Sequence, residues 1–148
     1  MRRRLRIFIA EDQRMVRQAL TIFLEQDRRF HVVGLAATAQ RALEGVAEVE
    51  PDLLILDLDL PGGHGLDVLA ALGESEARPW VLVYTGHADL PTREACLRAG
   101  ADGVLEKDGN FHSLAAWCRD IAGRLADGHL DRARRTGLES APRRAAAG

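Results

Sequence analysis

Short apolar runs recur along this chain, and several of them are continuous instead of alternating with polar residues. Continuous runs of this length are typical of strands that are buried on both faces of a parallel sheet. The pattern predicts five strands, at residues 7–9, 32–33, 53–56, 81–84 and 104–105.

Between these runs, apolar residues recur at spacings of three and four, which predicts amphipathic helices. Thr38 precedes the second helix as a suitable N-cap. The fourth helix is predicted to begin near Asp89, with Pro91 in its first turn, and to end at Gly100. The apolar positions of the other four are Val16, Leu20, Phe23 and Leu24; Ala39, Leu43 and Val46; Leu66, Leu69 and Leu72; and Phe111, Leu114, Cys118, Ile121 and Leu125.

The order of a strand followed by a helix thus repeats five times and ends near Leu125. Repeated units of this kind with short connections form a parallel sheet that helices cover on both faces. In such folds, ligands bind beyond the carboxyl ends of the strands, where the strand order switches. The residues that follow each strand are therefore the candidates for chemistry.

The composition narrows the class of protein. A chain of 148 residues that is 47% hydrophobic can bury the core of one globular domain. A net charge of −2 argues against a protein that coats nucleic acid in bulk or binds membranes through a polybasic surface. No run of about 18 apolar residues would span a membrane, and Arg6 interrupts the apolar stretch that a signal peptide needs. Cys96 and Cys118 are predicted to be buried, reduced thiols of a cytoplasmic protein.

The C-terminal segment differs from the rest of the chain. Residues 128–148 contain five arginines against Asp131 and Glu139, and they have little apolar content. Such a segment favours an arginine-rich extension or linker that is partly disordered. We therefore expect residues 1–127 to form the domain.

Charged and hydroxyl side chains stand at the ends of four predicted strands. Glu11 and Asp12 follow the first strand, and Asp57 follows the third. Thr85 ends the fourth strand, and Lys107 follows the fifth. Because the carboxyl ends of parallel strands meet at one edge of a sheet, three carboxylates would share a small volume with one ammonium and one hydroxyl. Lys107 is also the only lysine among 20 basic residues, which indicates a position where a compact amine is needed.

Clustered carboxylates repel one another, which raises a pKa unless a cation compensates. Mg²⁺ suits such a cluster because it binds one or two carboxylates together with water and phosphate oxygens. A carboxylate beside Mg²⁺ and a lysine can attack phosphorus and form an aspartyl phosphate. Mg²⁺ and the lysine offset the negative charge on the transferred phosphoryl oxygens, and a hydroxyl can donate a hydrogen bond to one of these oxygens.

Over about residues 5–126, this set of strand ends resembles the receiver domain of two-component response regulators. Residues 57–61 (DLDLP) and 99–103 (AGADG) are part of the resemblance, and Lys107 followed by Asp108 is similar to the NarL/FixJ (LuxR-type) subfamily. The resemblance implies an α/β, doubly wound, flavodoxin-like fold. It also implies a five-stranded parallel sheet of order 2-1-3-4-5, with five helices on both faces.

The resemblance further implies roles for the acidic residues. Asp57 would be the phosphoacceptor, supplied by a phosphohistidine of a sensor histidine kinase or by a small phosphodonor. Asp12 and Asp57 would bind Mg²⁺ directly, Glu11 would help through water, and Asp59 would add its backbone carbonyl. Mn²⁺ would be able to substitute for Mg²⁺.

Three further residues take their roles from the same resemblance. Thr85 would be the switch hydroxyl, Lys107 the counter-charge of the phosphoryl group, and the N–H of Gly86 a phosphoryl contact. The domain would be a cytoplasmic signalling module that catalyses at most its own phosphorylation and dephosphorylation. Homodimers are common in the family.

Two positions depart from the family pattern. The aromatic switch residue of many receivers lies three residues before the lysine, where this chain has Val104. A coupling that turns an aromatic ring inward cannot operate with valine, so the read-out is expected to differ or to be weaker. Asp108 stands where many receivers have a proline after a cis bond, and we expect no cis bond before it because a non-proline cis bond costs roughly 3 kcal/mol.

Each site residue also has an ordinary structural interpretation. Two acids can cap a helix, an Asp can form a turn, a Thr suits a strand and a Lys suits the surface. These interpretations apply to Glu11 and Asp12, Asp57, Thr85 and Lys107, in that order. Their joint occurrence at the strand ends favours a shared site instead.

Two other functions are consistent with the motifs. Residues 57–59 form an Asp-x-Asp at a strand end, as in haloacid-dehalogenase-like phosphatases, although that motif should end the first strand of its fold. Val104 leaves open a receiver-like interaction domain that works without phosphorylation. Direct DNA binding is not expected, because a helix-turn-helix domain would need roughly 50–65 residues after the linker. The chain would be a stand-alone receiver or the regulatory half of a transcriptional regulator.

Overall fold

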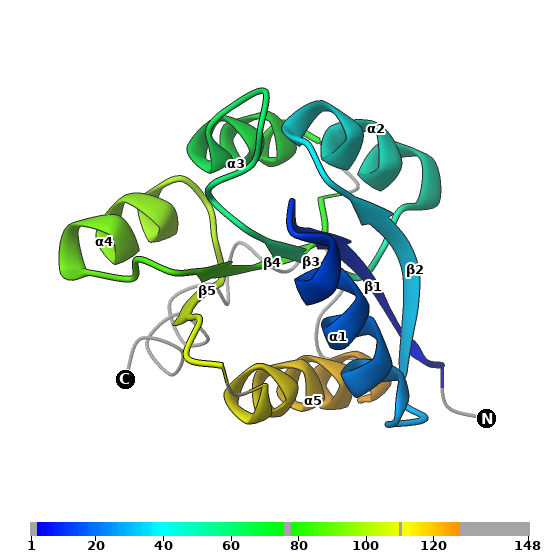
Figure 1. Cartoon of the computed structure of the whole chain (residues 1–148). Coiled ribbons are helices and arrows are strands. Elements are labelled where there is room, and N and C mark those ends of the chain that lie inside the picture. Colours follow the sequence, from blue (N-terminus) through cyan, green and yellow to red (C-terminus); the bar gives the residue numbers. More distant parts are fainter. Residues whose placement is uncertain (1–2, 76–77, 110, 128–148) are drawn as a thin grey trace.

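The computed structural model describes residues 3–75, 78–109 and 111–127, and strands and helices alternate along them as predicted (Figure 1). The expected extension at residues 128–148 lies outside the described residues. The strands are β1 (Leu5–Ala10), β2 (Phe30–Ala36), β3 (Leu53–Leu56), β4 (Trp80–Thr85) and β5 (Gly103–Glu106). The helices are α1 (Arg14–Glu25), α2 (Ala39–Val49), α3 (Gly65–Gly73), α4 (Leu90–Arg98) and α5 (His112–Ala126).

All five strands form one parallel sheet of order β2-β1-β3-β4-β5, which confirms the expected fold class. β1 therefore lies between β2 and β3, and the direction in which strands are added reverses at β1. The register places Ala10 opposite Leu56, so β1 and β3 end at the same level. The residues that follow these two strands consequently face one another across the switch point.

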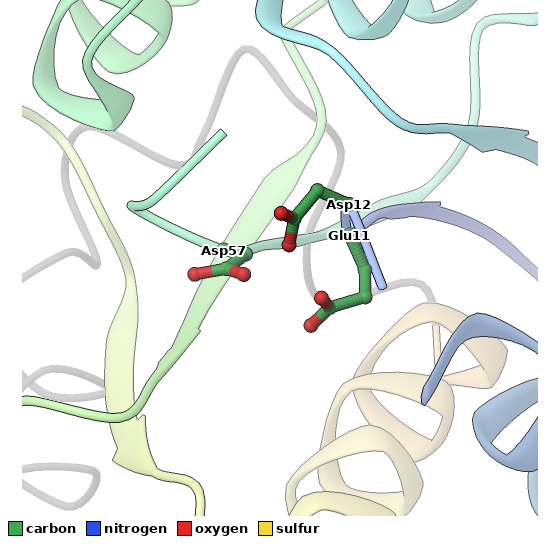
Figure 2. Close-up of side chains that lie close together, drawn as sticks. All are labelled: Glu11, Asp12 and Asp57. Carbon is green, nitrogen blue, oxygen red and sulfur yellow. The ribbon is translucent and has the colours of Figure 1, made fainter. Parts of the chain in front are cut away.

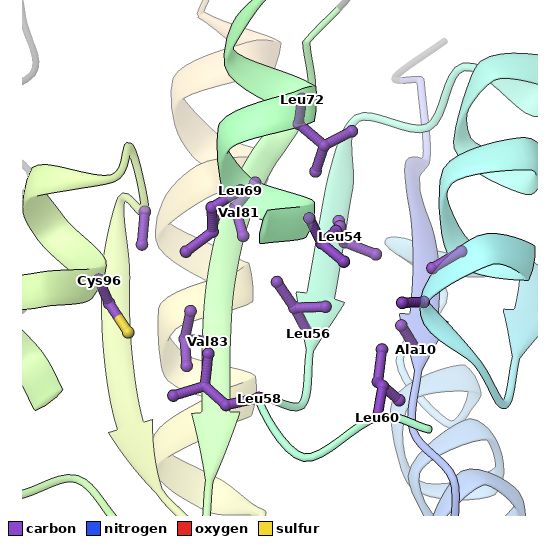
Figure 3. Packing of buried hydrophobic residues seen from close by; sticks show 14 of the residues in the cluster. Ala10, Leu54, Leu56, Leu58, Leu60, Leu69, Leu72, Val81, Val83 and Cys96 are labelled. Carbon is purple, nitrogen blue, oxygen red and sulfur yellow. The ribbon is translucent and has the colours of Figure 1, made fainter. Parts of the chain in front are cut away.

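The helices cover the two faces of the sheet unequally. α1 and α5 pack on one face, against alternate strand residues that include Ile7, Ile55 and Leu82 (Figure 1). α2, α3 and α4 pack on the other face, where Leu54, Leu56, Val81 and Val83 meet residues of α3 (Figure 3). Because both faces are covered, the central strands are continuously apolar, as the sequence pattern indicated.

The predicted helix ends are confirmed. The hydroxyl of Thr38 accepts a hydrogen bond from the N–H of Arg41, and the carboxylate of Asp89 accepts one from Thr92. Gly100, which follows the C-cap residue Ala99 of α4, has a φ of +114°, and the N–H of the next residue donates to the carbonyl of Cys96 at 2.9 Å. This geometry is a Schellman motif, which turns the chain sharply from α4 into β5.

The strand β2 was predicted too short, as residues 32–33 instead of Phe30–Ala36. β2 is an edge strand, and exposed His31 and Leu35 interrupt its buried positions. An edge strand therefore lacks the continuous apolar run that marks the central strands.

The two cysteines are unpaired and buried, as predicted, and they lie in different cores. Cys96 packs in the α2–α3–α4 core and Cys118 in the α1–α5 core. The backbone contains no cis peptide bond in its described parts, including the bond between Lys107 and Asp108. Within the same ranges, no helix combines the length and the apolar character that crossing a membrane requires.

Candidate functional site

The carboxylates that follow β1 and β3 converge at the carboxyl edge of the sheet (Figure 2). One oxygen each from Glu11, Asp12 and Asp57 lies within 4.8 Å of the others. Glu11 and Asp57 are only 2% and 4% exposed, whereas Asp12 lies on the rim and is exposed. The site therefore has a buried acidic floor and one acid that solvent reaches.

Lys107 brings the compensating charge from the end of β5. Its Nζ donates to Oε1 of Glu11 at 2.5 Å and to Oδ2 of Asp57 at 3.0 Å. Its backbone N–H donates to the carbonyl of Thr85 at 2.7 Å, which ties the ends of β4 and β5 together. One ammonium thus pairs with two buried carboxylates from two other strand ends.

Backbone N–H groups satisfy the remaining oxygens of the two buried acids. Oδ1 of Asp57 accepts from the N–H of Asp59 at 3.0 Å, and Oε2 of Glu11 accepts from the N–H of Gln13 at 2.9 Å. The backbone N–H of Asp57 also donates to the carbonyl of Ala10 at 3.0 Å. The orientation of both carboxylates is therefore set by the loops in which they lie.

Burial and charge shift the pKa values at this site. Burial raises the pKa of Glu11 above its ordinary value, although the hydrogen bond from Lys107 opposes the shift. Burial also disfavours the ammonium of Lys107, but its hydrogen bonds to Glu11 and Asp57 outweigh this and raise its pKa. Lys107 is therefore charged at neutral pH.

The donor set fits a magnesium ion. Carboxylate oxygens are hard ligands, and Mg²⁺ binds through one or two of them while it keeps several waters. The exposed Asp12 and the adjoining buried Asp57 offer such oxygens. Glu11 already holds Lys107 and a backbone N–H, which suits the indirect role expected for it. The side chain of Asp59 is exposed and lies outside the carboxylate group, so only its backbone is a candidate ligand.

Thr85 and Gly86 reach the same edge from β4. The Thr85 side chain is buried, and its hydroxyl accepts a hydrogen bond from the N–H of His87 at 3.4 Å. Gly86 follows directly and is exposed. The hydroxyl is thus bonded to its own loop in this structure.

One residue at this site was missed from the sequence. The Nη1 of Arg17, on α1, donates to the carbonyl of Glu11 at 2.8 Å and to that of Asp12 at 2.9 Å. Arg17 therefore holds the backbone of both acids through their carbonyl groups. The sequence feature that could have indicated Arg17 is its place five residues after Asp12, in the first turns of a predicted helix.

Val104 and the aromatic residue Tyr84, which directly precedes Thr85, lie on opposite faces of the sheet. Val104 is buried in the α2–α3–α4 core, and Thr85 at the end of β4 lines a hollow together with Leu58 and Cys96 of that core. Tyr84 packs in the α1–α5 core, where its ring lies 6.5 Å from that of Phe111. Tyr84 therefore does not replace the aromatic ring that Val104 lacks.

The family model of the response regulator receiver domain matches residues 7–119 of the chain. The match runs from within β1 through the other four strands and into the first half of α5. It includes every residue of the site described above.

Relatives and solved structures agree with this match. The uncharacterized transcriptional regulatory protein YvfU of Bacillus subtilis is 37% identical over 111 residues, which are 75% of this chain and 56% of that protein. A protein-glutamate methylesterase/protein-glutamine glutaminase of Cereibacter sphaeroides is 35% identical, over 82% of this chain and 34% of that protein. The chain thus spans about half or less of these relatives. The crystal structure of a LuxR-family two-component response regulator from Aurantimonas has a TM-score of 0.76 and 26% identity, and covers 81% of this chain and 86% of that one.

Proposed function

The chain belongs to the response regulator receiver domain family, and we propose that it accepts a phosphoryl group on Asp57 in a Mg²⁺-dependent reaction and thereby switches an interaction surface. One observation carries the proposal. Two buried carboxylates from different strand ends share the single lysine of the chain, with a third, exposed carboxylate beside them. A structural ion pair needs only one acid, whereas phosphoryl transfer to a carboxylate beside a cation uses all four groups.

Receiver domains are signalling domains that sensor histidine kinases phosphorylate, and they bind Mg²⁺ at an acidic pocket. For this chain we assign the metal to Asp12 and Asp57, with Glu11 acting through water and Asp59 through its backbone carbonyl. The bound ion would offset negative charge on the transferred phosphoryl oxygens. Mn²⁺ should serve as well, since it prefers the same oxygen ligands.

In the proposed reaction, an oxygen of Asp57 forms the new bond to phosphorus while the bond from phosphorus to the imidazole nitrogen of the donor breaks. The leaving imidazole keeps the electron pair of that bond and takes up a proton. Lys107, already 3.0 Å from Asp57, stabilises charge on the transferred oxygens. The hydroxyl of Thr85 and the N–H of Gly86 are assigned to those oxygens after transfer.

The proposal also assigns a phosphodonor, a cellular compartment and an output to this domain. The phosphodonor is a sensor histidine kinase in the cytoplasm, and the two buried, unbridged cysteines accord with a reducing compartment. The name of the Bacillus subtilis relative favours an output in transcription regulation over the esterase output of the other relative, and Lys107-Asp108 supports the same choice. A second copy of the chain is a further candidate partner, since homodimers are common in the family. No finding supports the phosphatase alternative, and Asp57 follows the third strand of the chain instead of the first.

The test is intact-mass measurement after incubation with Mg²⁺ and acetyl phosphate. The wild-type protein should gain one phosphoryl group, and Asp57→Asn should gain none because the nucleophilic oxygen is lost. Asp67→Asn, an exposed acid on α3, is the matched control and should behave as wild type. A wild-type protein that gains no mass, or an Asp57→Asn variant that does, would contradict the proposal and favour a domain that works without phosphorylation.

A further inference from the structure

Arg93 joins three elements near the proposed switch residue. It projects from α4, and its Nε donates to the carbonyl of Ala88 at 2.8 Å, in the loop between β4 and α4. Its Nη1 donates to the carbonyl of Val104 on β5 at 2.9 Å. A planar guanidinium offers several donors in fixed directions, so one side chain can hold two carbonyls at once.

Ala88 is the fixed point of the loop at residues 86–89. It is the buried residue of this loop, whereas its neighbours Gly86, His87 and Asp89 are exposed. Its carbonyl is held by Arg93, and its N–H donates to Oε1 of Glu106 on β5 at 3.4 Å. Apart from the cap that Asp89 forms with the N–H of Thr92, the loop is therefore attached to α4 and β5 through Ala88, which lies three residues after Thr85.

We propose that Arg93 is a positioning residue that couples the loop after Thr85 to α4 and β5, in place of the aromatic side chain that Val104 does not provide. The inference rests on the proposed phosphorylation of Asp57. Turning toward a phosphoryl group requires the Thr85 hydroxyl to give up the long hydrogen bond from His87. The loop then shifts, Ala88 moves with it, and Arg93 transmits the movement to α4.

The space around the loop is consistent with such a movement. A hollow of about 310 Å³ opens beside Thr85, between the residues after β3 and the first turns of α4. Its walls include Leu58, His87, Pro91 and Ala95. α4 thus has room on the side toward which the loop would be drawn.

The test compares hydrogen–deuterium exchange of the loop and α4 with and without Mg²⁺ and beryllium fluoride, which mimics the phosphoryl group. In the absence of the mimic, Arg93→Gln should exchange in this region about tenfold faster than wild type, because a charged donor to two carbonyls is lost. The mimic should accelerate exchange in wild type but change it little in the variant. Arg93→Lys keeps the positive charge but lacks the planar guanidinium, so its exchange rate and its response to the mimic should lie between those of wild type and Arg93→Gln. Arg98→Gln, an exposed residue of the same helix, should match wild type.

Acetyl phosphate labelling of Asp57 is measured on the same samples. Labelling of wild type and Arg93→Gln with an identical response of α4 to the mimic would overturn the coupling alone. Absence of labelling in wild type would overturn the proposed function and the coupling with it. If Arg93→Gln did not fold, a response of Arg93→Lys equal to that of wild type would overturn the inference, and a weakened one would support it.

Discussion

The two halves of the carboxyl edge differ in how firmly their residues are held. On the side of β1, β3 and β5, Lys107 bonds buried Glu11 and Asp57 at 2.5 and 3.0 Å. On the side of β4, the Thr85 hydroxyl and the N–H of Ala88 make hydrogen bonds of 3.4 Å, most of the loop is exposed, and the 2.8 Å bond from Arg93 to the carbonyl of Ala88 is its short attachment. A site that must bind a metal ion and then signal the phosphorylation of Asp57 needs both a rigid part and a part that can move. Fixed carboxylates provide the chemistry without reorganisation, and a weakly held loop provides the movement.

The largest expected effect is on the firm side. Lys107→Met would leave Glu11 and Asp57 buried without their shared cation, so the free energy of unfolding should fall by about 3 kcal/mol in metal-free buffer at pH 7. Urea denaturation measures this change. A loss below the error of the measurement would mean that the firm side is not held by this ion pair.

The matched control is Lys107→Arg, which keeps the charge and should fold. Its larger planar head cannot replace a compact ammonium between two carboxylates, so it should not convert phosphorylation into the conformational change. A phosphorylation-induced spectral shift equal to that of wild type would show that the single lysine has no special role.

The pH dependence of stability tests the same half through Glu11. Burial raises the pKa of Glu11 in the folded protein. The contribution of Glu11 to the free energy of unfolding is therefore fully present below the ordinary pKa of 4.5, and it is lost as the pH rises through the raised pKa. The stability of wild type relative to Glu11→Gln should therefore fall as metal-free buffer is taken from pH 4.5 toward neutrality. Thermal denaturation of both proteins at several pH values measures this difference in stability. Melting temperatures that change with pH in parallel for the two proteins would refute the prediction.

A smaller effect of opposite sign is expected on the rim. Asp12→Asn removes one of three neighbouring like charges from an exposed position, so it should stabilise the metal-free protein by about 0.5–1 kcal/mol. It should also abolish the stabilisation that added Mg²⁺ gives to wild type. Melting temperatures with and without Mg²⁺ test both statements. Glu48→Gln, an exposed acid on α2, is the control and should keep the Mg²⁺ response.

The smallest effect on stability is expected at the loop. Thr85→Val keeps the shape of a buried strand residue and loses one long hydrogen bond, so the free energy of unfolding should fall by less than about 1 kcal/mol. The exchange response of α4 to beryllium fluoride should nevertheless be lost. A large loss of stability would show that the loop side is as firmly held as the acid side.

The sequence was sufficient to predict the strand and helix order and the four strand ends that carry the site. Apolar periodicity and caps such as Thr38 and Asp89 act within one element, so they can be recognised without the fold. The extent of edge strand β2 could not be predicted in this way, because its exposed positions break the apolar run. Arg17 and Arg93 were missed because a long, flexible arginine finds its carbonyl partners only after the elements have packed.

The sequence by itself therefore determined which chemical groups stand at the carboxyl edge, since a charged residue directly after an apolar strand must emerge at that edge of a parallel sheet. Only the tertiary structure decided which of them meet. Lys107 is separated from Glu11 by 96 residues and from Asp57 by 50, and no local pattern relates such positions. The strand order and register bring the three side chains into hydrogen-bond distance, and burial there strengthens their interactions and shifts the pKa of Glu11 and of Lys107.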